Sequence, residues 1–179
     1  MHVSLVGSEM CIRDRGNQLV DISKRRLFSR KTQSYSSFPL PWLAEPTRFT
    51  EDCTRCGKCI ENCDTKIITK SDGGFPSVNF SIDECTFCYR CAEACPEPLF
   101  LTKEALPWQV KANINDSCLT KQNVECRCCG DLCDSIAIKF KLELGKVAQP
   151  DVDLDECNGC GACVSVCPTS SINVSNITA

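Results

Sequence analysis

The chain has 179 residues and a formal net charge of −3, and 18 of its residues are cysteine. Only 7% of the residues are aromatic, so a chain of this length cannot depend on a large apolar core and needs disulfides or metal centres. No apolar run approaches the roughly 20 residues of a membrane-spanning helix, and the acidic balance argues against nucleic-acid binding.

Residues 1–15, MHVSLVGSEMCIRDR, resemble translated read-through of a sequencing adaptor and match nothing in the pattern that follows. We interpret this stretch as an artefact of sequencing or translation. His2, the only histidine, and Cys11 then do not belong to the natural protein, and neither has a partner at a metal-ligand spacing.

Residues 16–46 are predicted to form a basic, largely irregular N-terminal tail. The segment SKRRLFSRK (residues 23–31) contains the pair Arg25 and Arg26, as a twin-arginine export signal would, but the following KTQSYSSFPLPW is polar and interrupted by proline. An export signal needs an apolar run of roughly 7 to 15 residues, so we expect a cytoplasmic protein whose thiols stay reduced. The tail is either a solvated arm or a docking peptide.

Three cysteine motifs with the spacing C-x2-C-x2-C-x3-C follow the tail: CTRCGKCIENC, CTFCYRCAEAC and CNGCGACVSVC. Their candidate metal ligands are Cys53, Cys56, Cys59, Cys63, Cys85, Cys88, Cys91, Cys95, Cys157, Cys160, Cys163 and Cys167. This spacing lets a tight loop present three thiolates to one [4Fe-4S] cluster, while the fourth comes from elsewhere. Zinc sites usually combine two separated ligand pairs, so a structural zinc protein is the weaker alternative.

A fourth copy, CLTKQNVECRCCGDLC at residues 118–133, is irregular. Its last three cysteines keep the regular spacing, but Asn123 stands where the first cysteine belongs. We predict that an earlier cysteine replaces it and that Cys128 is left over. The candidate ligands of this motif are Cys118, Cys126, Cys129 and Cys133. The alternative is a decayed site with Cys118 or Cys128 as a buried or free thiol, which would leave three clusters instead of four.

The motifs fall into two pairs, which indicates duplicated modules at residues 47–101 and 114–175, joined by a linker at residues 102–113. Within each pair, a short strand-like apolar run and a glycine-containing turn separate the motifs. The predicted fold class is α+β: tandem bacterial two-cluster ferredoxin-like modules, with short strands and short helices around [4Fe-4S] clusters.

In the bacterial two-cluster arrangement, the last cysteine of each motif ligates the other cluster of the pair. The first module would then use the sets Cys53, Cys56, Cys59, Cys95 and Cys85, Cys88, Cys91, Cys63. The second module would use the sets Cys157, Cys160, Cys163, Cys133 and Cys118, Cys126, Cys129, Cys167. This crossing ties the parts of each module together, and metal binding contributes folding free energy that a small core lacks.

These motifs carry a resemblance to a known family. Together with the phrase GGFPSVNFSIDECTFCYRCAEACPEPLF, the variant SCLTKQNVECRCC, the ending CNGCGACVSVCP and the start SKRRLF, they resemble the NapF family, ferredoxin-type accessory proteins of the periplasmic nitrate reductase system. The resemblance covers residues 20–175 and departs from the family pattern at residues 1–15 and Cys128. It implies a cytoplasmic iron-sulfur protein that binds the molybdenum-containing nitrate reductase catalytic subunit and assists its maturation before export.

The sequence contains no nucleophile arrangement and no phosphate-binding loop, so we expect no catalytic residues and no enzyme activity of its own. An alternative function is that of an electron-transfer ferredoxin, or of the electron-input subunit of another oxidoreductase. Both functions need the same clusters, so the residues do not separate them, whereas the neighbouring genes would.

Overall fold

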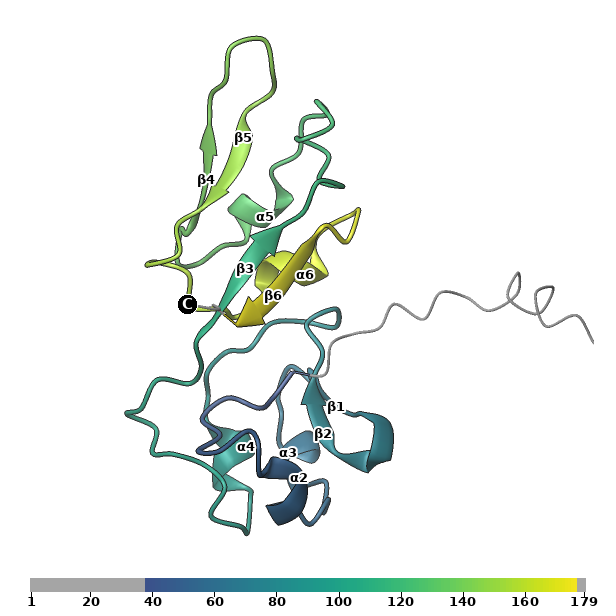
Figure 1. Ribbon diagram of the computed structural model, residues 1–179, viewed down its shortest axis with the longest axis vertical. Helices are drawn as coiled ribbons and strands as arrows, with labels where there is room; N and C mark the ends of the chain where they lie inside the picture. Colours follow the sequence, from purple (N-terminus) through teal and green to yellow (C-terminus); the bar gives the residue numbers. More distant parts are fainter. Residues whose placement is uncertain (1–37, 177–179) are drawn as a thin grey trace, which may run out of the picture. The chain divides into compact units, whose positions relative to one another are not determined.

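The structure is a computed structural model that describes residues 38–176 (Figure 1). The predicted artefact at residues 1–15 and most of the predicted tail at residues 16–46 lie outside the described residues. None of the helices in the described part of the chain is long and apolar enough to pass through a membrane.

The elements are short throughout the described residues, and each α-helix has four residues. In residues 38–107, here called the first half, they are α2 (Phe49–Asp52), α3 (Lys58–Glu61), β1 (Ile68–Lys70), the 3-10 turn η1 (Asp72–Gly74), β2 (Pro76–Val78) and α4 (Arg90–Glu93). In residues 108–176, the second half, they are β3 (Val110–Ile114), α5 (Cys128–Asp131), β4 (Ile138–Lys141), β5 (Gln149–Val152), α6 (Ala162–Ser165) and β6 (Ile172–Asn176). This mixture of short helices and strands agrees with the predicted α+β class.

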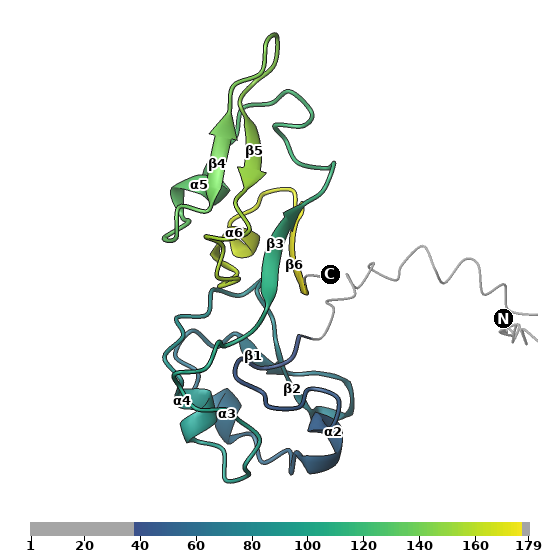
Figure 2. The same cartoon turned by 60° about the vertical axis from the view of Figure 1, so that its left-hand side comes forward.

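Three two-stranded antiparallel sheets organise these elements (Figure 2). The strand-like runs predicted between the motifs form the hairpins β1–β2 and β4–β5. In the second half, β3 precedes and β6 follows the hairpin β4–β5 in the sequence. These two strands pair with each other from Val110↔Asn176 to Ile114↔Ile172. In the first half, the corresponding contact between the two ends is a single bridge, Leu43↔Phe100. The two halves therefore share one plan, and the second half has the longer end-to-end pairing.

The first half begins earlier than the predicted module boundary at residue 47. Leu40, Trp42 and Leu43 are buried, although they belong to the segment expected to be an irregular tail. The Trp42 backbone N–H donates to the Pro107 carbonyl oxygen at 2.6 Å, and the Trp42 carbonyl accepts from the Leu101 N–H at 2.7 Å. These apolar residues are too few to form a recognisable sequence pattern. Their positions are determined by partners about 60 residues away, and Trp42 Nε1 also donates to the Ala105 carbonyl oxygen.

The expected linker at residues 102–113 also differs from the structure. Its last residues form most of strand β3, which pairs with β6 across the second half. The sequence VKANI of this strand has only moderate apolar alternation, with Val110 and Ala112 buried. Its extended conformation is therefore determined mainly by the distant partner strand, which no local pattern reveals.

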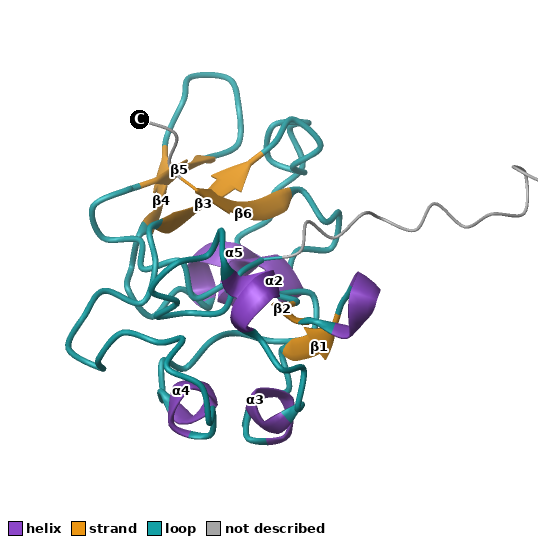
Figure 3. Cartoon of the chain, turned by 60° about the horizontal axis from the view of Figure 1, so that its bottom comes forward, coloured by secondary structure: helices purple, strands orange, loops and turns teal. Residues whose placement is uncertain are grey.

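The core of each half is small and includes cysteines. Leu40, Ile67 and Val78 are almost fully buried in the first half, and Ala137 is fully buried in the second. Helices α3 and α4 lie side by side (Figure 3), and Cys59 of α3 belongs to the same apolar cluster as Ile67. Few large side chains are fully buried, so we expect metal binding to contribute to the folding free energy.

The two halves contact each other through aromatic rings and backbone. Trp108 packs edge-on against Phe80 and Phe87 of the first half, with ring centroids 5.7 and 5.9 Å apart, and its Nε1 donates to the Asn158 carbonyl oxygen at 3.2 Å. The backbone of Gly161, with φ of +88°, passes directly against the Phe80 ring, where a Cβ atom would overlap the ring. Glycine is therefore required at residue 161 both for its conformation and for space.

Replacing Gly161 by alanine is predicted to destabilise the contact between the halves. Gly57 is a matched control, because its φ is also positive (+80°) but nothing lies within 4 Å of an added Cβ. Gly57→Ala should cost about 1–2 kcal/mol from the left-handed conformation alone, and Gly161→Ala should cost more. Anaerobic denaturation followed by cluster absorbance measures both, and equal losses would show that the Phe80 contact contributes nothing.

Candidate iron-sulfur sites

The loops of the three regular motifs adopt one backbone conformation. The second residue after the first cysteine and the residue after the second cysteine both have positive φ in each loop. These residues are Arg55 and Gly57, Phe87 and Tyr89, and Gly159 and Gly161. A residue other than glycine, such as Phe87, adopts a left-handed φ at a cost in free energy. Alternation of right-handed and left-handed residues turns successive backbone N–H groups toward one concave side. The loops are thus shaped to face anionic groups.

Two pockets in the first half each collect four cysteines. The pocket of site 1 is lined by Cys53, Cys56, Cys59 and Cys95. The pocket of site 2 is lined by Cys63, Cys85, Cys88 and Cys91. Each site therefore brings together three cysteines of one motif and the last cysteine of the other, which are the crossed sets expected from the sequence.

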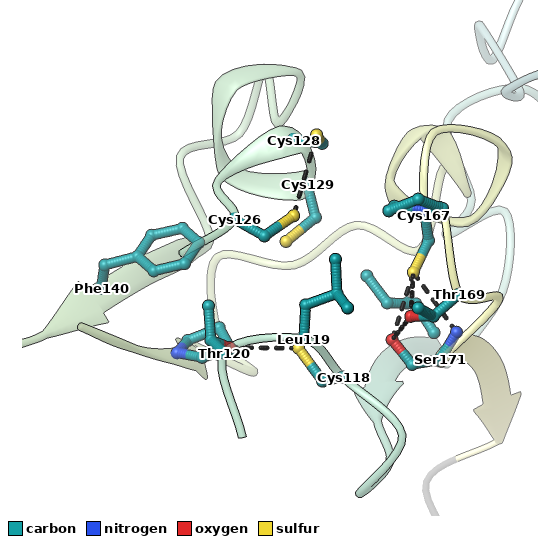
Figure 4. A pocket seen from close by; sticks show the side chains of 13 residues that line it. Cys118, Leu119, Thr120, Cys126, Cys128, Cys129, Phe140, Cys167, Thr169 and Ser171 are labelled. Carbon is teal, nitrogen blue, oxygen red and sulfur yellow. Dashed lines mark hydrogen bonds between the residues drawn. The ribbon is translucent and has the colours of Figure 1, made fainter. Parts of the chain in front are cut away.

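The second half repeats this arrangement around two further sites. Site 3 comprises Cys133, Cys157, Cys160 and Cys163. The Cys163 thiol interacts electrostatically with the other three and with Cys129 of the neighbouring site, and Cys160 interacts with Cys133 and Cys157. Site 4, of the irregular motif, has a pocket lined by Cys118, Cys126, Cys129 and Cys167 (Figure 4). The structure thus gathers all sixteen candidate ligands into four groups of four.

In each half, two short helices connect the two sites. A cysteine in each helix belongs to one site, and the cysteine four residues later belongs to the other. These pairs are Cys59 and Cys63, Cys91 and Cys95, Cys129 and Cys133, and Cys163 and Cys167. Four helical residues advance the chain by only about 6 Å. The two sites of each half are therefore close neighbours.

The irregular motif is explained by Asn123 and Cys118. Asn123 occupies the position where a ligand is expected, and its Oδ1 accepts a hydrogen bond from the Val147 backbone N–H at 3.1 Å, in the turn between β4 and β5. Cys118 is buried and lines the site 4 pocket. Cys128 is exposed, yet it also borders this pocket, with its Sγ 3.8 Å from that of Cys126. The Cys128 thiol therefore lies closer to site 4 than its position between two motif cysteines in the sequence suggests.

The buried thiols do not readily ionise without a compensating positive charge. The pKa of Cys91 and that of Cys163 are raised to about 12, mainly by burial and further by the charge of neighbouring thiolates. Burial likewise raises the pKa of Cys59, Cys85 and Cys129 to about 11. Iron binds thiolates, so iron must displace these protons and neutralise four converging negative charges. The donor set of four sulfurs per site fits an iron-sulfur cluster.

The cysteines border pockets instead of converging on one point. Within residues 38–176, no three or more His, Cys, Asp or Glu side chains are grouped closely enough to share a single metal ion. A zinc ion would hold its sulfur ligands about 2.3 Å away, whereas a cube presents its iron atoms at separate corners. This arrangement of the thiols suits a polynuclear cluster.

Hydroxyl groups that the sequence reading did not single out lie beside the ligand sulfurs. Cys63, Cys133 and Cys167 each have a Thr or Ser two residues later, and so does Cys118. The sulfur–oxygen distances are 3.7 Å to Thr65, 3.5 Å to Ser135, 3.7 Å to Thr169 and 3.1 Å to Thr120. The recurring pattern C-x-[ST] is the signal that would have revealed them. Burial raises the pKa of Cys167, but hydrogen bonds from Ser171 and Thr169 outweigh this effect, so that its pKa is lowered overall.

Comparison with known families supports the chemistry of these sites. The model of a 4Fe-4S dicluster domain matches residues 30–100, and that of a 4Fe-4S binding domain matches residues 150–173. The irregular motif at residues 118–133 lies outside both matches. The chain accordingly binds [4Fe-4S] clusters, and zinc is set aside as the metal of the regular motifs.

Curated relatives cover most of the chain. It is 48% identical to the ferredoxin-type protein NapF of Haemophilus influenzae over 84% of this chain and 86% of that protein. It is 41% identical to the ferredoxin-type protein NapF of Escherichia coli K12 over 86% of this chain and 94% of that protein. A more distant relative, the methylamine utilization ferredoxin-type protein MauM of Methylophilus methylotrophus, is 29% identical over 82% of this chain and 73% of its own length. The chain therefore belongs to the family of ferredoxin-type NapF proteins.

Proposed function

We propose that the chain holds four [4Fe-4S] clusters, one at each of sites 1 to 4, in two tandem two-cluster modules with crossed ligands. The observation that carries this proposal is the grouping of four cysteines, from two motifs each, around every site. Cys118 is the substitute ligand of site 4, and Cys128 is not a ligand of the regular set.

A bound [4Fe-4S] cluster supplies one-electron transfer at a potential that the surrounding protein sets. The residues of the chain hold the sulfur ligands, exclude water and fix the distances between sites. Trp42, Phe87 and Tyr89 contribute to this shielding at site 2. Trp42 and Tyr89 both line its pocket, and the Trp42 ring centroid is 5.1 Å from that of Tyr89 and 6.3 Å from that of Phe87.

The function we propose is that of a cytoplasmic accessory protein for the periplasmic nitrate reductase system. It would bind the molybdenum-containing catalytic subunit before export and assist its maturation, without inserting into a membrane or binding nucleic acid. Family membership at 48% identity over most of both chains supports this role, as does the family resemblance described above. The basic tail is the part that we assign to docking.

A second candidate function is electron input to another oxidoreductase. The relationship to a methylamine utilization ferredoxin-type protein favours it, because that name associates a similar chain with a system other than nitrate reduction. This role would use the same clusters but would not require the chain to bind a nitrate reductase subunit.

Cluster number is the first quantity to measure. Anaerobically purified protein should contain about 16 iron and about 16 acid-labile sulfide per chain if all four sites are filled. About 12 of each would mean that the irregular motif holds no cluster. Bound zinc without labile sulfide would contradict the proposal altogether.

Two cysteine substitutions test the assignment at site 4. Cys118→Ser should remove about four iron per chain, because its buried sulfur is one of the four site ligands. The matched variant Cys128→Ser should remove none, since this exposed thiol is outside the ligand set. The opposite result would show that Cys128 is the ligand, and unchanged iron in both variants would mean that site 4 is empty.

Binding experiments separate the two candidate functions. The full chain with its clusters should bind the purified, unexported nitrate reductase catalytic subunit, and deletion of residues 1–34 should abolish binding while iron content stays constant. Unchanged binding after deletion would remove the docking role of the tail. No binding by the full chain, together with electron transfer to another oxidoreductase, would favour the second function.

A further inference from the structure

We propose that site 4 has the highest reduction potential of the four sites and is the electron sink of the chain, and that the buried hydroxyls of Thr120 and Ser171 set this potential. The inference rests on the proposed filling of all four sites. It adds a direction of electron flow and names two residues that tune the terminal site.

The hydrogen bonds at site 4 are short and shielded from water (Figure 4). Thr120 Oγ1 lies 3.1 Å from Cys118 Sγ, and Ser171 Oγ lies 3.1 Å from Cys167 Sγ. The Ser171 backbone N–H also donates to Cys167 Sγ at 3.3 Å. The two residues are only 2% and 1% exposed, so water cannot replace these bonds.

The direction of these hydrogen bonds follows from the chemistry of the ligand. A ligating cysteine carries no proton, so the hydroxyl must donate to the sulfur. Thr169 Oγ1 donates to Ser171 Oγ at 3.2 Å, which leaves the Ser171 proton free to point at Cys167 and strengthens its bond. Donors to a thiolate offset negative charge, and a reduced cluster carries one more electron, so these donors raise the potential.

At the other sites, hydroxyl groups lie farther from the sulfur that corresponds to Cys167 Sγ, which is that of the last cysteine of a motif. Site 2 has Thr65 at 3.7 Å from Cys63, and site 3 has Ser135 at 3.5 Å from Cys133. At site 1 the residue two positions after Cys95 is Glu97, which has no hydroxyl group; its backbone N–H donates to Cys95, and its negative charge acts on Cys95 in the opposite sense. Backbone N–H donors also reach sulfurs of the other sites, but hydroxyl donors at 3.1 Å occur at Cys118 and Cys167 of site 4. The closeness of these hydroxyls therefore favours electron uptake most at site 4.

Fixed charges support the same direction from the first half to the second. At site 1, Arg55 and Glu97 both line the pocket, so their charges oppose each other. At site 3, Lys111 Nζ donates to the Cys157 carbonyl oxygen at 2.5 Å and brings a positive charge to that site, which the negative charge of Glu84 beside Cys160 partly offsets. At site 4, the Arg127 guanidinium lies 5.3 Å from the centroid of Phe140, a residue of the pocket lining. Site 3 thus becomes an intermediate acceptor before site 4.

A direct contact links the two halves along this route. The Cys85 backbone N–H of site 2 donates to the Cys160 carbonyl oxygen of site 3 at 2.8 Å. Within each half, the short helices already place the two sites close together. The sites therefore follow one another in the order 1, 2, 3, 4. The cysteines of sites 1 to 4 would hold clusters in this order, and the bound clusters would supply one-electron transfer from an external low-potential one-electron donor, with no proton or bond transferred.

The test is a potentiometric titration of the intact holoprotein, followed by low-temperature EPR of the reduced clusters. In Thr120→Val and Ser171→Ala, the highest-potential component should shift to a more negative potential, and the other components should stay in place. Thr65→Val is the matched control, because it removes the longer 3.7 Å contact at site 2; any shift should be smaller and in another component. Iron content should be unchanged in all three variants.

A ligand substitution assigns the component and separates the two proposals. In Cys126→Ser the iron content should fall by about four per chain, and the highest-potential component should disappear. If iron falls but the highest-potential component remains, the four-cluster proposal stands and the electron-sink inference is overturned. If the wild-type chain holds about 12 iron and this substitution removes none, the four-cluster proposal itself has failed. Unshifted potentials in both hydroxyl variants would also overturn the inference.

Discussion

The structure depends on one electrostatic constraint, which is the grouping of four thiol groups around each of four partly buried sites. Burial raises the pKa of Cys91 and Cys163 to about 12, so these groups stay protonated at neutral pH unless positive charge is supplied. Iron supplies that charge and releases the protons. The free energy of cluster binding is thereby linked to the free energy of folding, and the constraint on the sulfurs becomes a constraint on the backbone.

Several features of the fold are consequences of this constraint. The left-handed residues at fixed positions of the ligand loops, such as Tyr89 with φ of +70°, are adopted because the loop must curve around a site. Helices α3, α4, α5 and α6 are only four residues long because each connects cysteines of two neighbouring sites. Each site groups cysteines from both motifs of its half, and the hydrogen bond between the Cys85 N–H and the Cys160 carbonyl joins the halves. A small apolar core is sufficient in this arrangement.

The cysteine spacing allowed much of this arrangement to be predicted, because ligand spacing is a local property of the sequence. The grouping of cysteines from two motifs and the place of Cys118 at the site 4 pocket were expected from the motifs and the known two-cluster pattern. The burial of Trp42 and the pairing of β3 with β6 could not be predicted, because both depend on partners far away in the chain. The proximity of Cys128 to Cys126 and the aim of the Ser171 hydroxyl depend on side-chain geometry that spacing does not specify.

The measurement that most directly tests the central claim is amide hydrogen exchange of the full chain before and after anaerobic removal of iron by a chelator. The sheet β3–β6 has the longest strand pairing in the described residues and is the element best able to persist without metal. If cluster binding supplies the folding free energy, its amides should lose protection together with those of the hairpins β1–β2 and β4–β5. Retained protection of β3–β6 in the iron-free chain would show that the apolar core suffices, and would contradict the account.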